Sequence, residues 1–397
     1  MANKNLTRAK RAKNDEFYTQ FDDIQKEIEA YLEYNPDVFR GKAVYCNCDD
    51  PYESNFFRYF ALKFNQLGLR QLITTSYKPS PIANTQLELF DFGDDNDAKP
   101  KGRPKVSANK FIINQVPEID DYGEFNLKSI ARQLKANKQN EWTPLKGDGD
   151  FRSDECIALL KQADIVVTNP PFSLFREYVR QLVDYDKSFV IIGSKNAITY
   201  KEIFPLLQTN KMWIGTTSFN KDMLFIAPSN ADLSMKPKTA VREVDSVTYL
   251  RSPSVWFTNL DHGRRHQPLP LMTLQDNLKF SKHKELRGKK EYDKYDNYDA
   301  IEVPFTDAIP SDYDGAMGVP ISFLDKYCPE QFEILGITDR DNNSGLKTKE
   351  YSEADSPNFG DLNRRGAILV GGKLVSTYAR LLICHRCKNG EKKWKPL

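Results

Sequence analysis

The segment that most restricts the fold of this chain is an apolar strand that ends at two consecutive prolines. Residues 164–168 read DIVVT, and the tetrad Asn169-Pro170-Pro171-Phe172 follows directly. A run of β-branched residues without polar alternation is typical of a strand buried on both faces, and proline, which lacks an amide hydrogen, ends strand pairing. The sequence therefore predicts a sheet covered by helices on both faces, with a ligand site where this strand ends.

Strand and helix patterns alternate on both sides of this segment. Strands are predicted at 43–48, 69–75, 111–114, 164–168 and 188–193, with short strands at 211–214, 222–226, 246–250 and 254–258; helices are predicted at 54–67, 153–162, 173–183 and 200–208. Ser54 is the expected N-cap of the first of these helices, and Gly68 ends it. We therefore predict an α/β fold with a mostly parallel sheet over residues 1–262.

Two regions depart from this alternation. Residues 78–109 are rich in proline, glycine and charge, and we predict a loop insertion with a short hairpin near 87–92. Residues 263–397 are richer in charge, tyrosine and turn residues, with strands expected at 301–303, 332–337, 367–370 and 374–383. This second region is predicted to be a separate module.

The Asn-Pro-Pro-Phe tetrad has a chemistry that suits an aromatic amine. An Asn169 side-chain oxygen and the Pro170 carbonyl can accept both protons of an amino group, and Phe172 can stack on the ring that carries it. Pro171 helps to fix the backbone. The alternative is a strand-ending turn without catalytic function.

The order of several segments resembles one family, the EcoRI-type DNA adenine-specific (N6) methyltransferases. The similar segments are NDEFYTQ (14–20), VYCNCDDP (44–51), GDGDFRS (147–153), TNPPFSLFREY (168–178) and VWFTNLDHGRR (255–265). The resemblance spans most of residues 3–265 and continues more weakly through 295–337. It implies a class I, Rossmann-like fold that uses S-adenosylmethionine (SAM), with residues 263–397 as an appended target-recognition module. It also implies methylation of the adenine N6 amino group in double-stranded DNA, as by a modification methylase.

The resemblance also implies which residues contact the cofactor and the substrate. Asn169, Pro170, Pro171 and Phe172 would form the catalytic tetrad, and the cofactor would contact Phe17, Tyr18, Thr19, Cys48, Asp49, Asp50, Asp148, Asp150 and Phe151. One departure is the absence of a glycine-rich Phe-x-Gly-x-Gly after the first strand, where this chain reads CNCDDPYESNF. Asp49 and Asp50 could instead cap a helix.

Basic residues are clustered, although the net charge is only +2. We expect DNA contacts from Arg8, Lys10, Arg11, Lys13, Arg264 and Arg265, and a further basic cluster covers residues 279–294. A local salt bridge is the alternative for Arg264 and Arg265. A KGRPK segment at 101–105 resembles an AT-hook, for which a solvated loop is the alternative.

The remaining features restrict the class of protein. The sequence contains no long apolar run and no secretory signal, and the six cysteines suggest no disulfide framework, so we expect a cytoplasmic monomer. Cys384 and Cys387 have zinc-knuckle spacing but no second pair of ligands nearby, and no metal is expected. Double-stranded DNA is the expected partner, with a cognate restriction endonuclease as a further one and no membrane. A protein-glutamine or RNA methyltransferase and a catalytically silent DNA-binding relative are the rival functions.

Overall fold

The computed structural model describes residues 18–47, 54–76, 108–116, 137–227, 233–234 and 236–386. These residues form two compact units. The first unit contains the described residues up to Lys195 together with Gly215–Thr217 and Lys221–His262; the second contains Asn196–Ile214, Ser218–Asn220 and the described residues from Gly263 onward. The second unit is therefore not one continuous segment.

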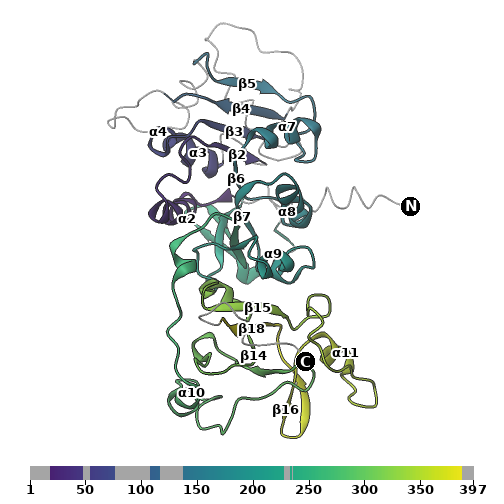
Figure 1. Cartoon of the computed structure of the whole chain (residues 1–397). Helices are drawn as coiled ribbons and strands as arrows, with labels where there is room; N and C mark the ends of the chain where they lie inside the picture. Colours follow the sequence, from purple (N-terminus) through teal and green to yellow (C-terminus); the bar gives the residue numbers. More distant parts are fainter. Residues whose placement is uncertain are drawn as a thin grey trace, which may run out of the picture. The chain divides into compact units, whose positions relative to one another are not determined.

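A mixed sheet lies at the centre of the first unit, and Figure 1 shows helices on both of its faces. Its strands are β2 (Ala43–Asn47), β3 (Gln71–Thr75), β4 (Asn109–Ile113), β5 (Glu141–Pro144), β6 (Ile165–Thr168), β7 (Ser188–Ser194) and β12 (Ser254–Thr258). Within the first unit, they lie in the order β5-β4-β3-β2-β6-β7-β12. Only β3, β2, β6 and β7 pair in parallel, whereas β4, β5 and β12 pair antiparallel with their neighbours. The prediction of a mostly parallel sheet is therefore corrected: parallel pairing is confined to the four central strands.

The helices of the first unit are α2 (Phe21–Tyr34), α3 (Asn55–Leu62), α4 (Phe64–Leu67), α7 (Asp154–Gln162) and α8 (Phe175–Asp184). The helix predicted over 54–67 is interrupted at Lys63; the Ser54 side chain accepts the amides of Phe56 and Phe57, and Gly68 ends α4 with φ at 63°. These contacts are the N-cap and C-cap interactions that the sequence predicts at Ser54 and Gly68.

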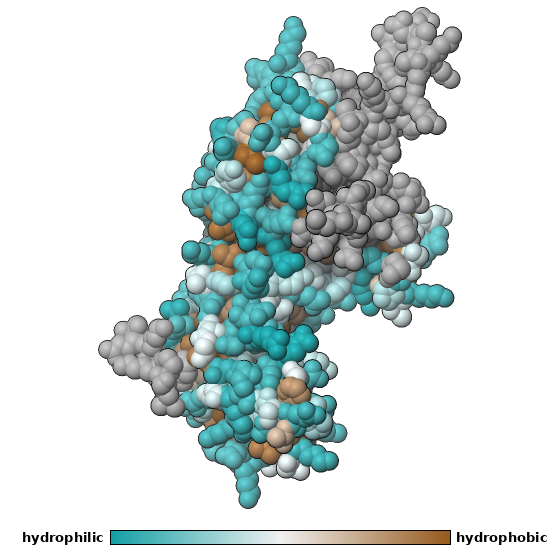
Figure 2. All heavy atoms as spheres, turned by 90° about the vertical axis from the view of Figure 1, so that its right-hand side faces the viewer, coloured by the Kyte–Doolittle hydropathy of each residue, from teal (hydrophilic) through white to brown (hydrophobic). Residues whose placement is uncertain are grey.

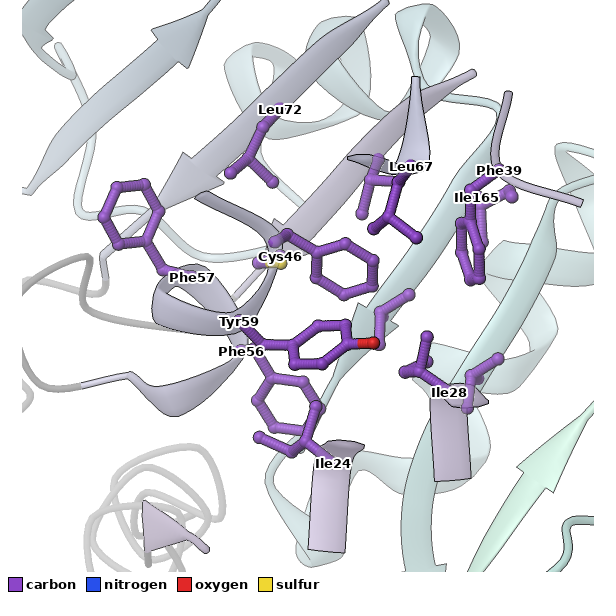
Figure 3. Close-up of a cluster of buried hydrophobic side chains, with 14 of the residues drawn as sticks. Ile24, Ile28, Phe39, Cys46, Phe56, Phe57, Tyr59, Leu67, Leu72 and Ile165 are labelled. Carbon is purple, nitrogen blue, oxygen red and sulfur yellow. The ribbon is translucent and has the colours of Figure 1, made fainter. Parts of the chain in front are cut away.

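The main hydrophobic core packs α2, α3 and α4 against one face of this sheet. Alternate strand residues such as Cys46 and Leu72 meet aromatic residues of α3, and Figure 3 shows them beside Phe56, Phe57 and Tyr59. The intervening residues of the same strands are also buried, so both faces of the sheet are covered. Burial on both faces explains the continuous apolar runs in the sequence.

A small antiparallel sheet also belongs to the first unit. It contains β1 (Tyr18–Thr19), β9 (Met223–Ile226), β11 (Val247–Ser252) and β10 (Val241–Val244), in that order. Strand β10 is absent from the predictions above. Asp245 and Ser246, both with positive φ, form its two-residue hairpin turn with β11.

A four-stranded sheet forms the centre of the second unit. Its order is β13 (Ala300–Glu302), β14 (Ala316–Pro320), β18 (Arg380–His385) and β15 (Phe332–Ile337), and only β13 and β14 are parallel. The unit also contains β8 (Trp213–Ile214), a hairpin of β16 (Ala367–Val370) and β17 (Lys373–Ser376), and the helices α9 (Phe204–Gln208), α10 (Leu274–Phe280) and α11 (Phe359–Arg364). Short 3₁₀ helices occur along the described part of the chain: η2 (Phe172–Leu174), η3 (Lys195–Thr199), η4 (Lys238–Ala240), η5 (Gly263–His266), η6 (Thr306–Ala308) and η7 (Ile321–Lys326).

Two predicted segments differ in detail from the structure. The strand predicted over 374–383 is two strands: β17 pairs with β16, whereas β18 pairs with β14 and β15. The predicted insertion at 78–109 lies mostly outside the described residues, and so do its predicted hairpin and the AT-hook-like segment. At its end, Asn109 already belongs to β4. Among the described helices, none has the length and apolar character needed to cross a membrane. The face shown in Figure 2 is mostly hydrophilic, with small separate apolar patches.

Candidate active site

Strands β2 and β6 are held in register by two polar contacts, one at each end of the pair. At the amino end, the Asp164 carboxylate accepts the Ala43 amide at 2.7 Å. At the carboxyl end, the Thr168 hydroxyl donates to the Asn47 carbonyl. Because both ends of the pair are fixed, Asn169 starts at a defined place beside the end of β2.

A buried network of hydroxyl and amide groups joins the same strand ends. The Thr75 hydroxyl, at the last residue of β3, donates to Asn47 Oδ1 at 3.0 Å and lies 3.0 Å from the Tyr45 hydroxyl. Tyr45 and Thr75 are fully buried, and Asn47 is 3% exposed. Each group has a partner, so the network avoids the penalty of an unsatisfied buried polar group without using a charge.

The Asn-Pro-Pro-Phe tetrad follows β6 directly. Asn169 and Phe172 are half-buried, whereas Pro170 and Pro171 are buried. Phe172 packs against the main core, and the Pro171 carbonyl accepts the Leu174 amide at 2.9 Å in η2. Because the Pro171 carbonyl already accepts a hydrogen bond within the turn, the Pro170 carbonyl is the candidate acceptor for a substrate.

The helix after the tetrad is seated on the sheet through a glycine. A Cβ on Gly193 of β7 would lie 2.5 Å from the Phe175 ring. The Phe175 ring also lies against Phe257, with 5.1 Å between centroids. Only glycine leaves room for this ring, so the start of α8 is fixed close behind the tetrad.

The GDGDF segment at 147–151 lies against the end of β3. Gly149 has φ at 81°, and a Cβ there would lie 2.0 Å from the Ser76 carbonyl oxygen. Both the conformation and the close approach require glycine. The predicted cofactor residues Asp148 and Asp150 therefore flank a backbone that contacts the strand end.

Asp150 is held by an arginine. The Arg152 guanidinium bonds both oxygens of the Asp150 carboxylate, at 2.9 and 2.6 Å, and reaches Glu177 of α8 at 3.0 Å. Burial raises the pKa of Asp150, but the hydrogen bonds and charge of Arg152 outweigh it and hold that pKa below its ordinary value. Asp150 is thus kept ionised, whereas Asp148 is exposed.

Phe151 joins this segment to the helix of the tetrad. Its ring is 3% exposed and meets the Tyr178 ring edge-on, with centroids 5.0 Å apart. The Gln181 side chain donates to the Phe151 carbonyl at 3.0 Å. Phe151 therefore supports the site from its interior and presents little surface of its own.

Tyr18 and Thr19 form β1, next to the start of α3. The Thr19 carbonyl accepts the Asn55 side-chain amide at 2.7 Å. The Thr19 hydroxyl is buried and has no hydrogen-bond partner among the described residues, while Tyr18 is half-buried. A buried hydroxyl without a partner costs free energy, so we expect a further group to bond the Thr19 hydroxyl beside the start of α3.

The predicted DNA contacts are placed only in part. Arg264 pairs with the buried Asp325 at 2.8 Å, and Arg265 stacks over Trp213 and donates to Asn210 at 2.8 Å. Both guanidinium groups thus have partners within the second unit. Several predicted residues lie outside the described part of the chain: Phe17, Cys48, Asp49, Asp50, Arg8, Lys10, Arg11 and Lys13.

Four residues that position the site are missing from the sequence predictions. Thr75 and Thr168 are hydroxyl residues at the last position of buried strands, and Asn55 and Arg152 follow predicted site segments. A hydroxyl at the end of an otherwise apolar strand is the signal that could have identified the first two. In the described residues, no group of three or more His, Cys, Asp or Glu side chains could hold a metal; Cys384 is buried in β18, and Cys387 lies outside them.

Comparison with known proteins extends these observations to nearly the whole chain. The model of the family "Adenine-specific methyltransferase EcoRI" matches residues 5–386. Type II methyltransferase M.EcoRI of Escherichia coli is 43% identical over 345 residues, which cover 85% of this chain and 92% of that protein. M.MpnI of Mycoplasma pneumoniae is 36% identical over 331 residues, covering 83% and 84%, and M.MgeORF184P of Mycoplasma genitalium is 35% identical over 337 residues, covering 83% and 85%. No solved structure matches. The resemblance predicted from the sequence is confirmed, and the chain belongs to the EcoRI family of adenine-specific methyltransferases.

Proposed function

We propose that this adenine-specific methyltransferase transfers the methyl group of SAM to the N6 amino group of adenine in double-stranded DNA. Its family supports the reaction class. The observation that carries the proposal is the Asn-Pro-Pro-Phe tetrad at the carboxyl end of β6, fixed by the Thr168 contact to Asn47. In open α/β sheets this edge is where ligands bind.

Asn169 and Pro170 orient the amine. The adenine amino group donates two hydrogen bonds, and its lone pair is delocalised into the ring. Accepting both protons on the Asn169 side-chain oxygen and the Pro170 carbonyl favours a more tetrahedral, more nucleophilic nitrogen. The rigid turn fixes both acceptors before the substrate arrives, which lowers the entropic cost of alignment.

Phe172 provides a stacking surface for the base. The ring is half-buried and packed against the main core, so one part is fixed and another remains accessible. An adenine must leave the duplex stack to reach such a site, at a cost of a few kcal/mol. Stacking on an aromatic ring together with the two amine hydrogen bonds can offset this cost.

The residues near the strand ends fit SAM, which supplies a methyl group activated by a sulfonium. The buried Thr19 hydroxyl has hydrogen-bonding capacity that no described residue uses. Asp150, held ionised by Arg152, can accept hydrogen bonds from hydroxyl or ammonium groups, and the exposed Asp148 lies beside it. We propose that these residues hold the cofactor, together with Phe17, Cys48, Asp49 and Asp50.

Residues 263–397 would then form the target-recognition module, and residues 1–262 the class I catalytic domain. The charged, tyrosine-rich composition of the second segment supports this assignment. We also propose that the enzyme acts sequence-specifically as a modification methylase and has a cognate endonuclease as partner. The relatives' classification as Type II methyltransferases supports this proposal.

Transfer of labelled methyl from SAM to duplex DNA, RNA and a protein extract tests the proposal. We expect N6-methyladenine in duplex DNA and no transfer to the other two; a preference for RNA or protein would replace DNA as the substrate. Asn169→Ala should reduce kcat on the order of 10²–10³-fold with DNA affinity nearly unchanged. Asn169→Asp, which keeps an acceptor oxygen, should retain more activity than Asn169→Ala. Wild-type activity in Asn169→Ala would remove the proposed role of the tetrad.

A further inference from the structure

We propose that residues 279–294 of the second unit form a surface that contacts the phosphate backbone of duplex DNA. This inference rests on the proposed function and adds the place at which the second unit meets its substrate. The segment includes the end of α10 and the turns that follow, and Figure 1 shows α10 and α11 at opposite sides of the second unit's sheet.

The net charge of the segment is more positive than that of the whole chain. Its net charge is +4, compared with +2 for the whole chain, because it contains seven cations and only three anions: Glu285, Glu291 and Asp293. The cations are Lys279, Lys282, Lys284, Arg287, Lys289, Lys290 and Lys294. Such a local excess is the electrostatic signature of a phosphate-binding surface.

Most of these cations are available to a partner. Lys282 pairs with Asp307 and Lys289 with Asp293. The other five are exposed, and none of them forms an ion pair with any described carboxylate: Lys279, Lys284, Arg287, Lys290 and Lys294. Cations that already neutralise a carboxylate gain less from a phosphate, so the unpaired ones carry the binding.

The backbone that displays these cations is anchored from beneath. Leu278, Leu286 and Tyr292 are buried, at 4%, 2% and 3% exposed. The Gly288 amide donates to the Leu278 carbonyl at 2.8 Å, and the Tyr292 hydroxyl donates to the Ala308 carbonyl at 2.7 Å. Apolar residues thus point inward between cations that point outward, and the surface requires little ordering on binding.

An aromatic ring lies among the cations. Phe280 is 60% exposed, and the Lys279 ammonium lies 5.0 Å from its ring centroid. This cation–π contact holds the Lys279 ammonium over the ring at the surface. The proposed function supplies duplex DNA as the partner of these charges, in place of an acidic protein.

The contrast with Arg264 and Arg265 strengthens the assignment. These residues, which the sequence suggested as DNA contacts, bind Asp325, Trp213 and Asn210 within the same unit. The basic cluster at 279–294 has few such internal partners. It is therefore the better candidate for backbone contacts in the second unit.

Two matched charge variants of the full chain test this surface. The first carries Lys279→Gln, Lys284→Gln, Arg287→Gln and Lys290→Gln. The control carries Lys201→Gln, Lys211→Gln, Lys326→Gln and Lys373→Gln, which are exposed residues of the same unit without a described ion pair. Both variants lose the same charge. Affinity for a short duplex is measured by fluorescence anisotropy between about 50 and 200 mM salt.

The patch variant should bind duplex DNA on the order of 10–100-fold more weakly at low salt. The slope of log affinity against log salt should become shallower by about 0.9 for each phosphate that the variant no longer neutralises, and the control should change little. Phe280→Ala should weaken binding without changing that slope. The kcat at saturating DNA should stay at the wild-type value in all three, because none of these residues belongs to the tetrad.

Two results would overturn the inference: equal losses of affinity in the patch variant and the control, which indicate a general effect of net charge, or no loss in either, which indicates a solvated surface. Both leave the proposed function standing if the wild type binds and methylates duplex DNA. A wild-type chain that does neither would refute the proposed function itself and this inference with it.

Discussion

Each unit of the molecule contains a buried polar network, and the two networks differ in charge and position. In the first unit, neutral groups of Tyr45, Asn47, Thr75 and Thr168 join the ends of three strands. In the second unit, the Arg380 guanidinium bonds the Glu302 carboxylate at 2.9 and 2.7 Å, and the Tyr295 hydroxyl donates to the same carboxylate. The first network lies at the strand ends next to the proposed site, and the second lies within a sheet.

The difference indicates what each network does. A buried ion pair is costly to desolvate and must be complete, so it affects stability strongly when one member is removed. Burial and the Glu302 carboxylate raise the pKa of Tyr295 well above its ordinary value, so its hydroxyl keeps the proton that it donates. A neutral network costs less to disturb, and its value at the strand ends lies in fixing positions.

The largest expected effect comes from breaking the ion pair. Arg380→Met leaves the Glu302 carboxylate buried, 5% exposed, without its cation. We expect a loss of about 3–5 kcal/mol in the free energy of unfolding, measured by urea denaturation. The methyl-transfer rate of the folded fraction should stay near wild type, because the pair lies outside the proposed site.

A double variant tests whether an unpaired buried charge, and not the loss of the Arg380 side chain, causes the instability of Arg380→Met. Arg380→Met with Glu302→Gln removes both charges and keeps an acceptor oxygen for the Tyr295 hydroxyl. It should recover much of the missing stability, because no unpaired charge is left buried. If the double variant is as unstable as Arg380→Met, the ion pair is not the source of the stability, and the contrast between the networks fails.

A smaller effect on stability is expected from the neutral network. Thr168→Val has nearly the same shape but cannot donate to the Asn47 carbonyl, and should cost about 1–3 kcal/mol. Because Asn169 follows directly, we expect methyl transfer to fall on the order of 10–100-fold. Initial rates at saturating SAM and DNA measure this reduction.

Thr258→Val provides the matched control for that variant. The Thr258 hydroxyl is also fully buried and donates to a strand carbonyl, that of Phe189, at 2.8 Å. It pairs with Val190 near the start of β7, at the opposite edge of the sheet from the ends of β2 and β6. A comparable fall in activity in both variants would show that instability, and not the position of Asn169, lowers the rate.

The elements of the first unit were largely predictable, because local patterns decide them. The apolar run at 164–168, the Ser54 cap and the Gly68 stop each act within a few residues, and all three appear as predicted. Strand direction depends on distant contacts. The pattern at 111–114 predicts a strand, but nothing local shows that β4 runs antiparallel to β3.

The second unit was harder to predict, for a reason visible in β14. Its sequence, AMGVP, contains a glycine and ends in proline, and both residues normally indicate a turn. A Cβ on Gly318 would lie 2.2 Å from the Tyr295 hydroxyl oxygen. The glycine is there to admit a ring from elsewhere in the chain, which no local pattern reveals. For the site, the tetrad was identifiable from its residues, whereas the Thr75 and Arg152 contacts depend on tertiary packing.

The smallest effect is expected from the Asp150–Arg152 pair, a charged contact in which the arginine is half-exposed. Because the pKa of Asp150 is lowered in the folded state, the pair stabilises the protein above the unfolded pKa of about 4, and this contribution disappears as pH falls through the folded pKa. Arg152→Gln should lower stability by less than about 1 kcal/mol at pH 7. The difference from wild type in urea denaturation should disappear in acid, once the pH has fallen through the lowered pKa of Asp150. A difference that persisted in acid would show that the guanidinium stabilises the loop by packing over the Phe151 ring, 5.3 Å from its centroid, and that charge contributes little there.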